Sequence, residues 1–330
     1  MDSLPVISFR EKLWLIASGA AVVAAVVLLP WIGTAPLTPE RVLARQSPDY
    51  PIFVELRLSR TLLGLLVGSS LSLAGALFQA MLRESMATPY TLGISSAASL
   101  GAILTIIAGL PSILGLPAVW LGALAGAGSS VAIVAGASAR QGQLSSFRLL
   151  LTGISLNGIC SALILMIHSL AREHRSISIL QWLLGNVDSV RYSALGAFAM
   201  VALVVFVIVV SRARQWNLLM VGESWAATRG VNPGRLMRIG FFCGSALTAT
   251  AIALSGPIGF VGLIVPHIVR SRISPDYRIL MPCSFLLGGV LLATADAVGR
   301  TVVAPAELPA GAVMALIGGP YLIWLVRRKF

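Results

Sequence analysis

Long apolar segments separated by short polar connections follow one another along nearly the whole chain. The ten apolar segments cover residues 13–32, 61–82, 92–109, 114–138, 149–170, 192–211, 239–255, 258–270, 280–299 and 309–326. A helix needs about 20 apolar residues to cross a bilayer core of roughly 30 Å. The pattern therefore predicts an all-α, multi-pass membrane protein, with about ten transmembrane helices in a single domain that covers residues 1–330.

The eighth segment, residues 258–270, is the weakest of the ten because a helix of about 13 residues spans only roughly 20 Å. It follows directly on Ser255-Gly256-Pro257. Proline removes a backbone donor and glycine loosens a helix, so such a break survives in a membrane only where protein or a water-filled cavity satisfies the freed groups. We expect a broken or re-entrant element here, and whether it spans the membrane fully stays open.

Elsewhere, Gly122-x-x-x-Gly126 and the stretch Gly68 to Gly75 predict close helix packing.

The composition leaves no room for a soluble catalytic domain. Apolar residues make up 57% of the 330 residues and charged residues only 11%. The polar-leaning intervals 33–60 and 212–238 are shorter than the roughly 40 residues below which domains rarely fold alone. Cys160, Cys243 and Cys283 all fall in apolar segments without CxxC spacing, so they predict neither disulfides nor a thiolate metal site.

The net charge of +12, from 24 Lys and Arg against 12 Asp and Glu, is explained by membrane topology. The basic residues lie at the ends of apolar segments and form no single patch, so we predict no nucleic-acid partner. With a cytoplasmic N-terminus and ten spans, sixteen of them fall on the cytoplasmic side and eight on the other. The positive-inside rule favours this orientation, which places both termini in the cytoplasm.

Residues for catalysis, ion coupling and nucleotide binding are missing. His168, His174 and His267 are scattered, and the sequence has no HExxH motif and no paired carboxylates at helical spacing, so we predict no enzyme. Asp296 is the only acid inside an apolar segment, which argues against an ion-coupled secondary transporter. Neither lysine follows a glycine as a P-loop requires. We therefore expect no cofactor in this chain, and any ATP is bound by partner subunits.

One cytoplasmic segment, about residues 212–238, is too long for a tight turn and predicts one or two short helices. The spacing Glu223-x-x-Ala226-x-x-x-Gly230 places small side chains on one helical side, where a partner could approach, and Gly230 can end the helix. An ordinary surface helix is the alternative.

Several motifs resemble the FecCD-type permeases of ABC importers over nearly the whole length. The run from Gly256 to His267, GPIGFVGLIVPH, resembles the family motif GPIGFVGLxxPH almost letter for letter. Four further stretches occur in the family's order: Arg57-Leu58-Ser59-Arg60, Gly75-Ala76-Leu77-Phe78-Gln79, Leu150-Leu151-Thr152-Gly153 with Asn157, and Ala304-Pro305-Ala306-Glu307-Leu308-Pro309. The broken-helix motif thus comprises Gly256, Pro257, Gly259, Gly262, Pro266 and His267.

The resemblance implies a type II ABC importer permease in the inner membrane of a bacterium. Its partners would be a second permease subunit, expected as a homodimer, two cytoplasmic ABC ATPases, and an extracytoplasmic substrate-binding protein. The expected cargo is an iron-siderophore chelate, with cobalamin or haem as alternatives. His267 could be taken for an iron or haem ligand, but beside Pro266 in a packed break we expect a structural role.

The resemblance also implies roles for individual residues. Arg57, Arg60 and Arg300 would receive acidic residues of the binding protein; alternatively they mark lipid headgroups or pair with Glu55. The residues expected to couple the permease to the ATPase are Gly222, Glu223, Ala226, Ala227 and Gly230. Thr152 and Asn157 would line the path at the subunit interface, unless they only bond neighbouring helices.

The inner gate resembles the family's in position and departs from it in sequence. The gate loops would be residues 83–89 and 145–148, with Met86, Ser146 and Phe147 as gate residues. Where family members commonly read RNPLADP, this chain reads RESMATP, so a carboxylate at Glu84 replaces a neutral amide. We therefore take Met86 as the gate candidate, and whether Glu84 faces the pore stays open.

Overall fold

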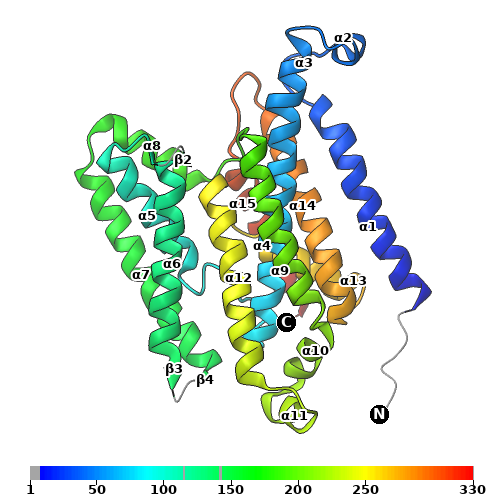
Figure 1. Cartoon of the computed structure of the whole chain (residues 1–330), viewed down its shortest axis with the longest axis vertical. Coiled ribbons are helices and arrows are strands. Elements are labelled where there is room, and N and C mark those ends of the chain that lie inside the picture. The colour runs from blue at the N-terminus through cyan, green and yellow to red at the C-terminus, as the bar shows by residue number, and fades with distance from the viewer. Residues whose placement is uncertain (1–7, 114–115, 141–142, 330) are drawn as a thin grey trace.

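The computed structural model describes residues 8–113, 116–140 and 143–329, and nearly all of this part is helical (Figure 1). The α-helices are α1 (Phe9–Leu28), α2 (Pro39–Leu43), α3 (Asp49–Pro51), α4 (Ser59–Leu82), α5 (Ile94–Ala108), α6 (Ala118–Ser138), α7 (Ser146–Leu170), α8 (Glu173–Leu184), α9 (Tyr192–Val210), α10 (Ala213–Val221), α11 (Glu223–Thr228), α12 (Pro233–Ser255), α13 (Val261–Arg272), α14 (Tyr277–Thr301) and α15 (Ala310–Lys329). A 3-10 turn, η1 (Leu29–Trp31), follows α1, and a π-helical segment, η2 (Ile52–Leu58), joins α3 to α4.

Two pairs of short antiparallel strands complete the structure. They are β1 (Ser112–Ile113) with β2 (Leu116–Pro117), and β3 (Ala139–Arg140) with β4 (Gln143–Leu144). Each pair bridges the ends of two consecutive apolar helices.

The predicted all-α membrane fold is confirmed, because each of the ten apolar segments overlaps one helix. These helices are α1, α4, α5, α6, α7, α9, α12, α13, α14 and α15. Within the described residues, seven helical stretches are long and apolar enough to cross a membrane, and α5 and α15 are shorter apolar helices. Helix α13 has only 12 residues, a length of about 18 Å.

Helix α4 lies at the centre of the bundle, and nearly all its residues are buried. Glycines let its neighbours approach closely, as the sequence predicted. A Cβ atom on Gly75 would overlap the carbonyl oxygen of Gly262 in α13, and one on Gly68 would overlap that of Gly288 in α14. The same kind of contact joins α5 to α6, where Gly101 meets Gly122 and Gly126. In lipid the hydrophobic effect does not drive helices together. Close backbone packing of this kind supplies van der Waals contacts that hold them together.

The chain between α12 and α13 is broken, and protein groups satisfy the freed backbone. Helix α12 ends at Ser255, and Gly256 takes φ of +68°, which favours glycine. The Ser255 carbonyl accepts a hydrogen bond from the Asn186 amide at 2.8 Å. A Cβ on Gly318 of α15 would lie within 2.6 Å of Phe260 side-chain atoms, so Phe260 packs directly on α15. The break is therefore a packed joint.

The bundle has two distinct ends (Figure 1). Helices α10 and α11, the strands β3 and β4 and the start of α1 gather at one end, and α2, α3 and α8 lie at the opposite end. Following the predicted topology, we call the first the inner end and the second the outer end. The two short helices expected within residues 212–238 are present as α10 and α11. Helix α8 was not predicted.

Candidate functional site

Three arginines and two carboxylates meet at the outer end and form what we call the outer arginine cluster: Arg57, Arg60, Asp296, Arg300 and Glu307. The Arg60 guanidinium donates to both Asp296 oxygens, with Nη2 to Oδ1 at 2.9 Å, and from Nη1 to Glu307 Oε2 at 2.7 Å. Arg300 Nε lies 3.1 Å from Asp296 Oδ2. The cluster joins α4, α14 and the loop between α14 and α15.

Arg57 is held differently, by backbone carbonyls. It is 7% exposed and donates to the carbonyl oxygens of Pro30 at 3.5 Å, Trp31 at 3.3 Å and Ala35. Gly33 makes room for this contact, since a Cβ there would lie 2.7 Å from Arg57 Cζ. Arg57 thus fixes the segment that follows α1.

The structure brings together the three arginines that the sequence singled out. A cavity of about 390 Å³ is lined by all three, together with Glu307 and Asp188. Arg60 pairs with Asp296 and with Glu307, and Arg300 pairs with Asp296. These carboxylates take the place of Glu55, which the sequence offered as an alternative partner. The Asp296-x-x-x-Arg300 spacing was the only sequence signal for this pairing. Their role in docking remains a prediction.

Two of the family motifs form one joint between α4 and α13. Pro266 has no amide hydrogen, so the Gly262 carbonyl, four residues earlier, lacks its helical donor. Gln79 Nε2 donates to that carbonyl at 3.3 Å, and Gln79 Oε1 accepts from Arg270 Nη2 at 3.1 Å. Gln79 is buried and lies one helical turn after Gly75 in α4. The glutamine therefore replaces the donor that the proline removes.

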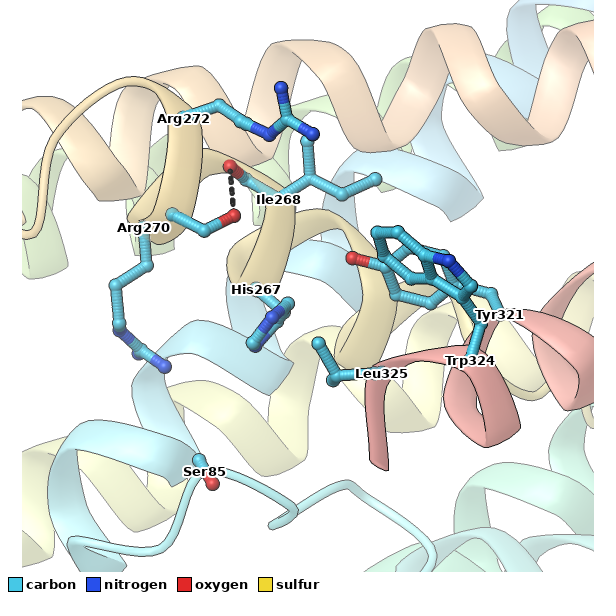
Figure 2. A pocket seen from close by; sticks show the side chains of 9 residues that line it. Ser85, His267, Ile268, Arg270, Arg272, Tyr321, Trp324 and Leu325 are labelled. Carbon is cyan, nitrogen blue, oxygen red and sulfur yellow. Dashed lines mark hydrogen bonds between the residues drawn. The ribbon is translucent and has the colours of Figure 1, made fainter. Parts of the chain in front are cut away.

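His267 lies at a pocket of about 590 Å³ at the inner end, between α13, α15 and the loop after α4 (Figure 2). The imidazole is 8% exposed, and its ring meets the Tyr321 ring edge to face at 6.3 Å between centroids. In Figure 2 the side chains of Arg270 and Arg272 run in different directions beside His267. Among the described residues, no group of three or more His, Cys, Asp or Glu could hold a metal ion. The surroundings of His267 fit a packing role.

The exposed side of α11 differs from the one that the sequence predicted. Ala226 was expected to face a partner, but it is fully buried, because it points into the bundle one turn after Gly222. Ala227 and Gly230 are exposed. Trp225 is also exposed, with the Arg229 guanidinium 4.7 Å above its ring. The surface that α11 can offer is therefore built on Trp225, Ala227 and Arg229, and Gly230 ends it at φ of +79°.

Helix α10 is anchored to the start of α14, a connection that the sequence did not predict. Asn217 Nδ2 donates to Asp276 Oδ1 at 2.8 Å, and Asn217 Oδ1 accepts from the Tyr277 amide at 2.9 Å. Asp276 also caps α14 and pairs with Arg278 at 2.6 Å. Burial raises the pKa of Asp276, but the hydrogen bonds from Arg278 and Asn217 outweigh it, so the pKa lies below its ordinary value.

A second connection joins α11 to the predicted gate loop. Glu223 Oε1 lies 3.1 Å from Arg83 Nη2, and Arg83 is the residue that directly follows α4. In the same loop, Glu84 Oε1 accepts from the Met86 amide at 3.2 Å, so this carboxylate caps its own turn. Met86 is exposed. The segment expected to meet the ATPase therefore contacts the loop expected to close the path.

The remaining gate and path candidates lie on α7. Ser146 Oγ donates to the Met81 carbonyl at 3.3 Å near the end of α4, and Phe147 is exposed. Thr152 and Asn157 are half-buried. Between them, Gly153 packs on the backbone of Leu92, where a Cβ would lie 2.5 Å from its Cα. Most of α7 is exposed in the single chain, with only 17% of its apolar stretch buried.

A multi-pass bundle with a break between α12 and α13, an ionic cluster at one end and short helices at the other is the architecture expected of an ABC importer permease, and the comparisons establish that class. The family model of the FecCD transport family matches residues 21–328, and the chain belongs to this family.

Relatives and a solved structure agree with this assignment. The chain is 36% identical to the hemin transport system permease protein HmuU of Yersinia pestis over 84% of each chain. It is 35% identical to the Fe(3+) dicitrate transport system permease protein FecC of Escherichia coli over 86% of each. A solved structure described as an inward-facing metal-chelate type ABC transporter superimposes with a TM-score of 0.83 and 28% identity, over 96% of this chain and 99% of that one.

Proposed function

We propose that this chain is the transmembrane subunit of an importer that moves an iron-siderophore-type chelate into the cytoplasm. The family match over nearly the whole chain carries the proposal. Relatives named for hemin and for Fe(3+) dicitrate agree with an iron chelate as cargo, and relatives named for cobalamin or vitamin B12 import keep cobalamin as the alternative. ATP hydrolysis belongs to two separate cytoplasmic ATPase subunits, and the chain itself is not an enzyme.

The working unit is a homodimer in the inner membrane of a bacterium, with the termini in the cytoplasm. A second copy as partner follows from the family resemblance, and the apolar face of α7, which the single chain leaves exposed, offers it a place to pack. Cargo passes along the interface between the copies, where the half-buried Thr152 and Asn157 supply polar groups. Met86, Ser146 and Phe147 close the inner mouth.

Energy enters at the inner end and cargo arrives at the outer end. The ATPase contacts the exposed side of α11, and the contacts Asn217 to Asp276 and Glu223 to Arg83 carry its movement to α14 and α4. Such rigid contacts suit a transition between two discrete packings. At the outer end, an extracytoplasmic binding protein docks on the outer arginine cluster through carboxylates, because opposite charges steer and orient the encounter.

Uptake by a reconstituted system tests the function. Proteoliposomes would hold this chain with its ATPase, and the binding protein would be added outside with labelled ferric siderophore, haem or cobalamin. We expect ATP-dependent accumulation of a ferric siderophore. ATP-dependent uptake of haem or cobalamin alone would reassign the cargo within the family, and uptake that needs no ATPase but collapses with an ion gradient would overturn the importer.

A further inference from the structure

Arg60 holds two carboxylates that differ in their exposure to solvent. Its Nε and Nη2 bind Asp296, which is 1% exposed, and its Nη1 binds Glu307, which is 45% exposed. Removing a partner from a buried ion pair is costly, whereas an exposed ion pair is weak and is screened by salt. The Asp296 contact is therefore fixed, and the Glu307 contact can be exchanged.

Arg300 offers a second cationic group beside this exchangeable contact. It is 4% exposed, and among the described residues its Nη2 has no hydrogen-bond acceptor. A buried donor without an acceptor is unusual and marks a place where an acceptor fits. Arg300 lines the same cavity of about 390 Å³ as Arg60 and Glu307. Three carboxylates, Asp188, Asp296 and Glu307, balance the three arginines of this region, so the unpaired Arg300 Nη2, and not net charge, indicates a place for a further acceptor.

We propose that Glu307 is an internal substitute for a carboxylate of the binding protein, and that docking exchanges one for the other on Arg60. The inference rests on the proposed docking function and adds a step to it. The incoming carboxylate takes Arg60 Nη1 as Glu307 leaves, and the cavity also offers it Arg300 Nη2. The exchange keeps Arg60 paired throughout, so no buried charge is left without a partner.

The position of Glu307 gives the exchange a consequence inside the permease. Glu307 lies on the loop from Val302 to Pro309, which leads directly into α15. Backbone hydrogen bonds fix the far end of this loop, from Leu308 to Gly299 at 3.0 Å and from Gly311 to Gly185 at 2.9 Å. Loss of the Arg60 contact therefore frees the part of the loop before Leu308. Docking would in this way loosen the entry to α15.

A purely structural role for Glu307 predicts the opposite result. If Glu307 only ties its loop to α4, its neutralisation leaves docking unchanged or weakens it by disordering the surface. If Glu307 competes with the incoming carboxylate, its neutralisation strengthens docking. The sign of the change in affinity separates the two roles.

The experiment measures binding-protein affinity for the complete permease and ATPase complex in nanodiscs, at low and at high salt. For Glu307→Gln we expect tighter binding by about two- to fivefold, the fold-change that corresponds to an exposed ion pair. Glu55→Gln is the matched control, since Glu55 is exposed at the same end outside the cluster. It should change the affinity much less than Glu307→Gln. Thermal unfolding of each variant checks that the fold is kept.

Arg60→Gln and Arg300→Gln separate a failure of this inference from a failure of the docking proposal. Both should weaken docking, and more at low salt than at high salt. If they weaken docking while Glu307→Gln leaves it unchanged or weakens it too, the exchange is wrong and the docking surface stands. If none of the three changes the affinity, both proposals are wrong.

Discussion

Gln79 of α4 donates a side-chain hydrogen bond to the Gly262 carbonyl of α13 at 3.3 Å, the carbonyl that Pro266 leaves without its helical donor. The contact is possible because Gly75 and Gly262 let the two backbones meet one turn away. The glutamine of one motif and the proline of another, 187 positions further along the chain, thus complete a single joint. We expect this joint to tolerate few substitutions.

Gln79→Leu should lower the free energy of unfolding by about 1–3 kcal/mol, because it leaves the buried Gly262 carbonyl without a donor. Gln181→Leu, at an exposed position on α8, is the control and should have little effect. Reversible unfolding in mixed micelles measures both. The double variant with Pro266→Ala tests the cause, since alanine restores an amide that can donate to Gly262. Equal costs of Gln79→Leu with and without Pro266→Ala would contradict this account.

Gly75→Ala should destabilise the protein by about 1–3 kcal/mol, because its methyl group would overlap the Gly262 carbonyl and force α4 and α13 apart. Gly128→Ala in α6 is the matched control, since nothing lies within 4 Å of the added Cβ. Alanine is the better helix former, so this variant should be unchanged or more stable by up to about 1 kcal/mol. Unfolding under the same conditions compares the two, and equal effects would reject close approach as the reason for Gly75.

The helices and the break between α12 and α13 could be predicted from the sequence because their causes are local. Apolar length sets a span, and Gly256 with Pro257 ends a helix whatever surrounds it. The small-residue contacts at Gly75 and Gly122 were also predictable, since glycine within an apolar helix indicates close packing. Helix α8 was not predicted, because it lies in a connection between two apolar segments and its mixed polar and apolar residues do not form a long apolar run.

The pairings at the two ends could not be predicted, because they join residues far apart in sequence. Arg60 and Asp296 are separated by 236 positions, and Arg83 and Glu223 by 140. Only Asp296 and Arg300, one helical turn apart, carried a local signal. The expectation for Ala226 was wrong because spacing defines the two sides of a helix and leaves open which side the bundle covers.

Asp296→Asn should be far more damaging than Glu307→Gln for the stability of the chain. The first leaves Arg60 and Arg300 buried without their shared carboxylate, at a cost of about 3–5 kcal/mol. The second removes an exposed partner and should cost about 1 kcal/mol or less. The unfolding free energies of the two variants in the same micelles measure the difference. Similar costs would show that Asp296 does not hold the cluster together.

Asp276 should make the stability of the inner end depend on pH in the acid range. Its pKa in the folded protein lies below the ordinary value, so its contribution is fully present above the pKa of the unfolded chain, about 4. The contribution is lost as pH falls through the lower, folded pKa. Asp276→Asn should therefore flatten the fall in melting temperature at acid pH. Glu40→Gln, at an exposed site of the outer end, is the control and should leave that slope unchanged.

Reversing the charge of one partner in the Arg83 and Glu223 pair should disturb transport much more than folding. Both side chains are partly exposed, so the pair contributes about 1 kcal/mol or less to stability. If it transmits movement from α11 to the gate loop, Glu223→Arg should raise the number of ATP molecules hydrolysed per cargo imported, because hydrolysis continues while the gate no longer follows. Arg83→Glu combined with Glu223→Arg restores opposite charges and should return that ratio towards the original value. Glu84→Arg makes the same change of charge next to the pair, at a residue outside the Arg83–Glu223 contact. This control distinguishes loss of that contact from a change in the local electrostatic potential. A double variant that stays as uncoupled as Glu223→Arg would show that the pair does not carry the signal.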